Sequence, residues 1–118
     1  MLVIREEQKG AFSQAVARNF ECGQYSHVSR VFPDRCRALG DPVVREWIRK
    51  GIREAAACGI DEEYEVSRYI DLMFLLSPDF GSDAQYAWAG PILEDASLAP
   101  KEKMDRLYER AREQLAAR

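Results

Sequence analysis

The sequence predicts an all-α protein, a compact bundle of about five to six helices around one apolar helix at about residues 61–76. Apolar residues recur at spacings of three and four along most of the 118 residues, and Gly and Pro residues separate these periodic segments. No run of alternating apolar and polar residues lies between hairpin turns, so strands are not expected. A chain of this length is expected to form a single helical domain, residues 1–118, with a core that needs neither disulfide nor metal.

The first predicted helix is amphipathic and runs from Glu6 to about Glu21. Gly10 weakens the pattern. After Gly23 the helical spacing continues as far as Pro33, which lacks the amide that a helix interior requires. The sequence leaves open whether this region is one bent helix or two.

The next helix is predicted to begin in the motif LGDP at residues 39–42. The glycine allows a turn, Asp41 is expected to cap the helix, and Pro42 occupies a first-turn position that needs no amide donor. Gly51 stands among large residues in this helix. Since a glycine there costs about 1 kcal/mol relative to alanine, we expect it to mark the close approach of a neighbouring helix.

The central helix has a start and a stop signal. Gly59 suits the left-handed residue that ends the preceding helix, Asp61 is expected to cap the new one, and Pro78 ends it. Its apolar run between residues 70 and 76 is far shorter than the roughly 20 residues of a membrane span, so we expect a core helix and no membrane segment. The apolar positions are Val66, Tyr69, Ile70, Leu72, Met73, Phe74, Leu75 and Leu76.

The C-terminal part is predicted to open with an irregular segment over residues 77–90, rich in turn-forming residues. A short helix is expected at about residues 85–93. A last helix is predicted to start at Pro100 and to carry a regular apolar stripe, formed by Met104, Leu107, Tyr108, Ala111 and Leu115.

Cysteine and histidine usage gives no sign of a metal site or a cofactor. Cys22, Cys36 and Cys58 are odd in number and widely spaced, and His27 is the single histidine. Such cysteines are expected to be reduced and structural. The first residues show no secretion-signal pattern, so the expected location is the cytoplasm.

Charge is unevenly distributed along the chain, although the net charge is only −3. Residues 30–53 contain seven basic and three acidic side chains, whereas residues 61–95 contain nine acidic side chains and one basic. Arg45, Arg49 and Arg53 step by four along one helix face, so they are expected either to bind an acidic protein surface or to pair with acids of this chain. Nucleic acid is a poor candidate partner, because the protein is acidic overall and lacks a recognisable nucleic-acid module.

Two further sets of residues are candidates for a role. Asp71 lies in the most apolar stretch, and Arg68 three residues earlier is the predicted partner in a structural polar pair. A catalytic role for Asp71 is disfavoured because no nearby histidine, nucleophile motif or second core carboxylate accompanies it, and we expect no enzyme. Tyr86 and Trp88, in the irregular segment, are interpreted either as anchors for a partner or as part of the core.

Short motifs spread over most of the chain carry a family resemblance: RKGI at residues 49–52, RYIDLMF at 68–74, PDF at 78–80, ILED at 92–95 and MDRLY at 104–108. With these motifs the chain resembles a family of small all-helical bacterial proteins associated with type VI secretion effector loci. The resemblance implies an adaptor or co-chaperone for an effector or its chaperone; alternatively, it implies an immunity protein that neutralises a toxin. Self-association is left open.

Overall fold

The computed structural model describes residues 9–117, and side chains from residue 18 onward. These residues form helices, turns and bends without a strand, which confirms the predicted all-α class. The helices are α1 (Lys9–Val31), α2 (Pro33–Leu39), α3 (Asp41–Ala57), α4 (Glu63–Leu75), α5 (Ala89–Glu94) and α6 (Pro100–Ala116), with a short 3₁₀ turn η2 (Ala84–Tyr86). None of the described helices is long and apolar enough to cross a membrane.

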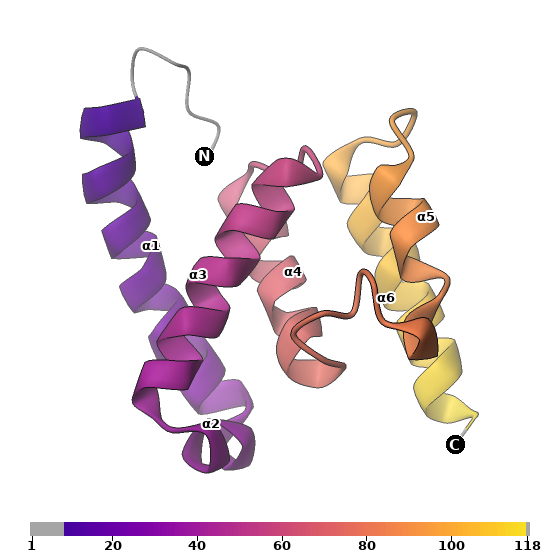
Figure 1. Ribbon diagram of the computed structural model, residues 1–118, viewed down its shortest axis with the longest axis horizontal. Helices are drawn as coiled ribbons and strands as arrows, with labels where there is room; N and C mark the ends of the chain where they lie inside the picture. The colour runs from indigo at the N-terminus through magenta and orange to yellow at the C-terminus, as the bar shows by residue number, and fades with distance from the viewer. Residues whose placement is uncertain (1–8, 118) are drawn as a thin grey trace.

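The helices form a flat slab with α4 at its centre. In Figure 1, α3 passes in front of α4, while α1 and α2 lie on one side and α5 and α6 on the other. The slab measures 45 × 38 × 19 Å, and its short dimension matches about two helix layers of roughly 10 Å each. The predicted arrangement around a central apolar helix is therefore confirmed, with α4 as that helix.

The contact between α3 and α4 is unusually close at Gly51. A Cβ atom built on Gly51 would lie 2.6 Å from Cγ1 of Ile70 and 2.8 Å from Sδ of Met73. Only a residue without a side chain fits at this separation, so the predicted close approach of a neighbouring helix is confirmed. One turn on either side, Ile48 and Ala55 continue the same buried face of α3.

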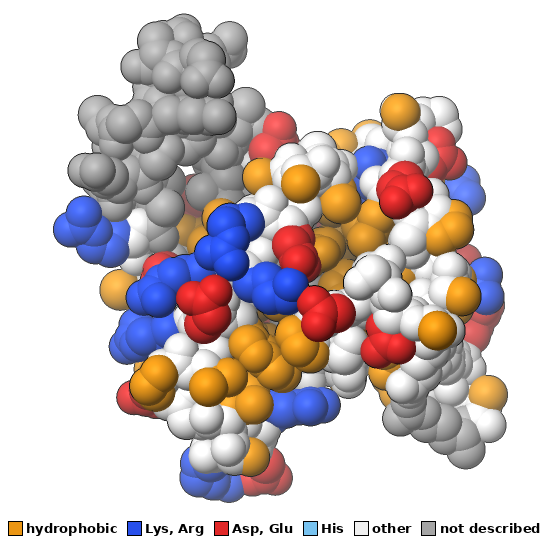
Figure 2. Space-filling model, viewed as in Figure 1, with side chains coloured by type: hydrophobic (Ala, Val, Ile, Leu, Met, Phe, Trp, Pro, Cys, Tyr) orange, Lys and Arg blue, Asp and Glu red, His pale blue; other side chains and the backbone are white. Residues whose placement is uncertain are grey.

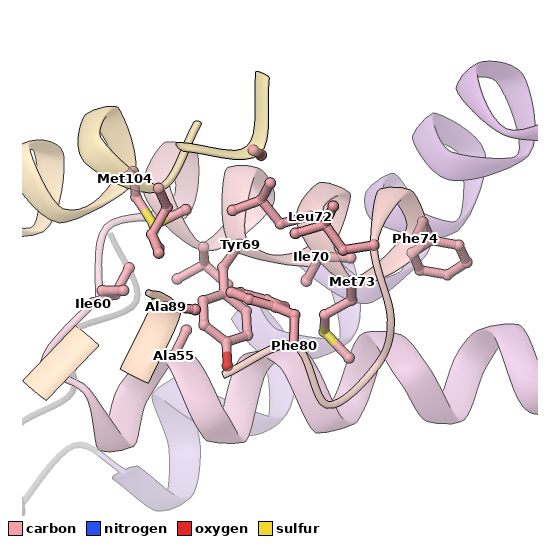
Figure 3. Close-up of a cluster of buried hydrophobic side chains, with 14 of the residues drawn as sticks. Ala55, Ile60, Tyr69, Ile70, Leu72, Met73, Phe74, Phe80, Ala89 and Met104 are labelled. Atoms are coloured by element: carbon pink, nitrogen blue, oxygen red, sulfur yellow. The ribbon is translucent and has the colours of Figure 1, made fainter. Parts of the chain in front are cut away.

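Aromatic rings close the core at the C-terminal end of α4 (Figure 3). Phe74 contacts the ring of Phe32 at a centroid distance of 5.8 Å and the ring of Trp47 at 5.1 Å. Phe80, from the turn after α4, is fully buried and packs on Tyr69 at 5.0 Å. The helix ends at Leu75, before Pro78 as predicted, and the chain that follows folds back over α4.

Gly59 ends α3 in the predicted way. Its φ is +80°, its amide donates to the carbonyl of Ala56 at 3.0 Å, and the Ile60 amide donates to the carbonyl of Ala55 at 2.8 Å. This pair of hydrogen bonds is a Schellman motif, and its two apolar members, Ala55 and Ile60, are both fully buried.

The two predicted aspartate caps are wrong. Helix α4 begins after Glu62, whose side chain makes no capping hydrogen bond, so Asp61 lies outside the cap position. Asp41 is the first residue of α3 rather than its cap, and its carboxylate accepts a hydrogen bond from the hydroxyl group of Tyr25 on α1. In both cases the turn before the helix places the acid one position away from the cap.

The structure resolves one boundary that the sequence left open and differs from the expectation at two others. Helix α1 runs without a break through Gly23 to Val31, and the predicted start at Glu6 lies outside the described residues. A separate short helix, α2, follows Pro33 and was not expected. The short helix predicted at residues 85–93 is divided into η2 and α5, whereas α6 begins at Pro100 as predicted.

Lys103 is a buried cation that the helical pattern did not identify. Its Nζ atom donates hydrogen bonds to the carbonyl groups of Cys58 and Leu93, both at 2.8 Å. The residue is almost fully buried. It therefore connects α6 to the end of α3 and to α5.

Gly51→Ala and Gly23→Ala form a matched pair of variants. Both glycines lie inside helices, but a Cβ on Gly23 would meet no atom within 4 Å. Gly23→Ala should raise the free energy of unfolding by about 1 kcal/mol through helix propensity. Gly51→Ala gains the same helix propensity, but the added methyl group pushes Ile70 and Met73 of α4 away from α3. The variant should therefore be less stable than Gly23→Ala by about 1–3 kcal/mol.

Urea denaturation followed by circular dichroism measures both free energies. Equal stabilisation by the two substitutions would contradict the close contact at Gly51.

Candidate protein-binding face

The three predicted arginines lie together on the outward side of α3. Arg49 and Arg53 are exposed, with 49% and 63% of their side-chain surface accessible, and Arg45 is half-buried. Figure 2 shows Lys and Arg side chains gathered over α3, with acidic side chains between them. Helical spacing therefore places these residues on one surface, as the sequence predicts.

Most of these basic groups have an acidic partner within the chain. Arg49 donates two hydrogen bonds to the carboxylate of Glu21 on α1, both at 3.1 Å, and Arg53 pairs with Glu46 at 3.2 Å. Lys50 bridges two carboxylates, at 2.5 Å from Glu54 and 2.9 Å from Asp79. Pairing with acids of the same chain, one of the two roles expected for the arginine stripe, is thus confirmed for Arg49 and Arg53.

Arg45 is held differently. Its guanidinium group lies 4.2 Å from the centre of the Tyr25 ring, a cation–π contact. The Tyr25 hydroxyl group donates to Asp41, and this hydrogen bond is the main reason that the pKa of Tyr25 is raised above its ordinary value. A ring fixed in this way orients Arg45 along the surface between α1 and α3.

An apolar edge lies beside the basic residues on α3. Val43 is 39% exposed, and Trp47, one helical turn further on, is half-buried against Phe74. Figure 2 shows apolar side chains next to the basic group on this side of the molecule. We use the term α3 face for the surface formed by these side chains together: Val43, Arg45, Trp47, Arg49, Lys50 and Arg53.

Tyr86 is buried in this structure, and Trp88 is half-buried. Tyr86 is only 4% exposed, and Trp88 packs edge-on against it at 6.1 Å. The indole Nε1 atom of Trp88 donates to Oε1 of Gln114 on α6 at 2.7 Å. Tyr86 therefore lies in the core, one of the two roles expected for it, because η2 folds onto α6, whereas a role of the half-buried Trp88 as a partner anchor stays a prediction.

The predicted pair between Arg68 and Asp71 does not form. Arg68 contacts Glu65 and Asp105, each at 3.0 Å, and its guanidinium group therefore faces α6. Asp71 instead lies against His27 of α1, whose Nε2 is 3.0 and 3.1 Å from the two carboxylate oxygens. Positions 68 and 71 of α4 face different neighbouring helices, and helical spacing alone could not show this.

Asp71 is a partly buried acid with one polar partner. Burial raises the pKa of its carboxyl group, and the hydrogen bond and positive charge of His27 act in the opposite direction. Tyr108 lies on the α6 side, and its hydroxyl group donates to the carbonyl of Arg68 at 2.9 Å. The arrangement ties α1 and α6 to α4 and was signalled in the sequence only by a charged residue within an apolar run.

A small cavity lies between the end of α3, the turn after α4 and α5. Its volume is about 220 Å³, and its lining includes Cys58, Tyr69 and the carboxylates of Glu54, Asp79 and Glu94. Burial raises the pKa of the Cys58 thiol and also that of the Tyr69 hydroxyl group. Since the reactive form of cysteine is the thiolate, Cys58 is not activated as a nucleophile here.

Searches for relatives and for metal ligands add no further site. Comparison of the chain with protein-family models, with curated proteins and with solved structures finds no match. Within the described residues, no group of three or more His, Cys, Asp or Glu side chains is placed to hold a metal ion. The α3 face is therefore interpreted as a binding surface from the geometry of this chain alone.

His27→Ala should raise the pKa of Asp71 further. The substitution removes both contributions that lower this pKa, while burial, which raises it, remains. A group whose folded-state pKa lies above its unfolded value of about 3.9 makes the protein less stable as the pH rises through that interval. The variant should therefore lose more stability than the wild type as the pH rises from about 4 through the folded-state pKa of Asp71.

NMR titration of the Asp71 carboxyl carbon measures this pKa directly. The double variant His27→Ala/Asp71→Asn is the control, because it lacks the titrating group and should show no such pH dependence. A pKa of Asp71 that is unchanged or lower in His27→Ala would contradict the pairing.

Proposed function

We propose that this chain is a non-enzymatic protein-binding adaptor whose α3 face docks onto an acidic, amphipathic helix of a partner protein. The observation that carries the proposal is that the exposed side of α3 carries a row of arginines toward α1 and the half-exposed apolar edge of Val43 and Trp47 toward α4. A groove-bound or face-bound helix is recognised by apolar anchors at helical spacing, with charges fixing its orientation.

The internal ion pairs of the α3 face do not oppose this role. Exposed pairs such as Arg53 with Glu46 contribute about 0.2–1 kcal/mol each, because water screens them and the long side chains lose entropy. A carboxylate of a partner can therefore replace Glu46 at little cost, whereas Glu21, which is 17% exposed and accepts two hydrogen bonds from Arg49, is expected to keep its place. The favourable energy then comes from burying Val43 and the exposed part of Trp47, since tryptophan is among the residues that contribute most at interfaces.

The resemblance to proteins of type VI secretion loci suggests what the partner is. In that setting, the chain acts in the bacterial cytoplasm and holds a secretion effector, or the chaperone bound to it, until the effector is loaded. An adaptor has to release the effector that it holds. Surface ion pairs that can exchange one carboxylate for another suit such reversible binding. An immunity protein, the alternative role, needs tight and lasting inhibition of a single toxin.

Neutralising the α3 face should weaken partner binding without unfolding the protein. The test variant is Arg45→Gln/Arg49→Gln/Arg53→Gln, and the matched control is Arg106→Gln/Arg110→Gln/Arg112→Gln, three exposed arginines of α6. The partner is first captured from the source bacterium with type VI secretion active and identified by mass spectrometry. The Kd for the purified partner should then rise about tenfold for the α3 variant, equivalent to about 1.4 kcal/mol, and stay within twofold for the control.

Circular dichroism and melting confirm that both triple variants are folded. Equal binding by the two variants would remove the α3 face from the proposal. A single toxin held stoichiometrically and neutralised by this protein would favour the immunity role over the adaptor role.

A further inference from the structure

An open hollow of about 500 Å³ lies between α1 and the first turns of α4. It shares no lining residue with the α3 face. The side chains and backbone around it come from Asn19, Phe20, Gly23, Gln24, Glu63, Tyr64 and Ser67.

The hollow is a consequence of Gly23. A Cβ atom at this position would meet nothing within 4 Å, so α1 presents bare backbone where it passes α4. Tyr64 is 71% exposed and is the most exposed large apolar side chain of the described residues. The hollow is therefore accessible from solvent and has aromatic groups in its lining.

Gln24, which also lines the hollow, has a side-chain oxygen without a hydrogen-bond partner. The residue is only 6% exposed, and its Nε2 atom donates to Oγ of Ser67 at 2.7 Å. Its Oε1 atom is the one buried side-chain polar atom of the described residues without a hydrogen-bond partner. An unpaired buried acceptor is unfavourable, and an N–H donor that reaches it when the soft terminal torsion of Gln24 turns would remove that cost.

The charges around the hollow favour a positive group. Glu63 lines it and Glu62 precedes Glu63 at the start of α4, whereas the helix dipole contributes only about half a positive charge there. Glu63 has an interaction of its own, but a carboxylate offers two oxygens and about four acceptor positions. The carboxylates of Glu62 and Glu63 therefore contribute negative charge at this side of the hollow.

The aromatic rings favour the same class of ligand. A cation is attracted to the face of an aromatic ring within about 6 Å. The guanidinium group of Arg68, which faces α6, already lies 5.7 Å from the centre of the Tyr64 ring. Phe20 provides a second, more buried ring in the lining of the hollow.

We infer that the hollow between α1 and α4 binds a protonated amine or guanidinium group on an apolar stem. Such a group combines donors for Gln24 and Glu63 with a positive charge and a stem that packs on Phe20 and Tyr64. The two sources with this chemistry are a lysine or arginine side chain of a protein and a free polyamine. The inference is independent of the role proposed for the α3 face.

The first test is a titration of the protein followed by amide and side-chain NMR. The probes are N-acetyl-arginine amide, its neutral analogue N-acetyl-citrulline amide, and spermidine. Saturable shifts of the Gly23 amide and of the Gln24 side-chain amide are expected with a cationic probe, with at least fivefold weaker binding of the citrulline analogue. Preference for the arginine probe over spermidine assigns the site to a basic side chain, and the reverse preference assigns it to a free polyamine.

The second test fills the hollow. Gly23→Leu places a side chain in open space within a helix, so the variant should fold, and it should bind the cationic probe at least tenfold more weakly than Gly23→Ala. Gln24→Leu tests the amide separately and should also weaken binding. Absence of saturable shifts, equal binding of the citrulline analogue, or unchanged binding by Gly23→Leu would each overturn the inference.

Discussion

The close contact of α3 and α4 at Gly51 is the constraint on which the other packing depends. Since the backbone of α3 lies directly against Ile70 and Met73, the two helices approach more closely than side chains would normally allow. This brings Trp47, on the edge of α3, onto the ring of Phe74. The apolar edge of the α3 face thus owes its position to a glycine one helical turn further along the same helix.

In the folded chain, several of the unevenly distributed charged side chains form ion pairs between different elements. Arg49 joins α3 to Glu21 of α1, Lys50 joins α3 to Asp79 in the turn after α4, and Arg68 joins α4 to Asp105 of α6. All of these pairs are at least partly exposed. Each contributes little to stability, and each leaves the chain with charges that a partner can engage by exchange.

Local signals in the sequence predicted the helices and their ends well. Gly59 and Pro100 act through backbone geometry that depends on one residue, and Gly51 stands out because glycine is costly inside a helix. The aspartate caps failed because capping depends on a shift of a single position. Whether Asp41 serves as the cap or as the first helical residue is decided by the preceding turn.

Long-range partners could not be predicted from helical spacing. The pattern shows which face of a helix is apolar, but not which helix lies against a given polar residue. Asp71 was recognised as a polar tie, yet its partner His27 lies 44 positions earlier in the chain. Tyr86 and Lys103 illustrate the same limit, since an aromatic residue in a loop and a lysine on a helix are ordinarily read as surface residues.

The most direct test of the α3 face is hydroxyl-radical footprinting of the protein, free and bound to its captured partner. Trp47 and Val43 are accessible enough to be oxidised in the free protein, while Tyr64 reports on the side of the hollow. Binding through the α3 face predicts that oxidation of Trp47 and Val43 falls in the complex while that of Tyr64 is unchanged. Protection of Tyr64 with full oxidation of Trp47 and Val43 would contradict the account.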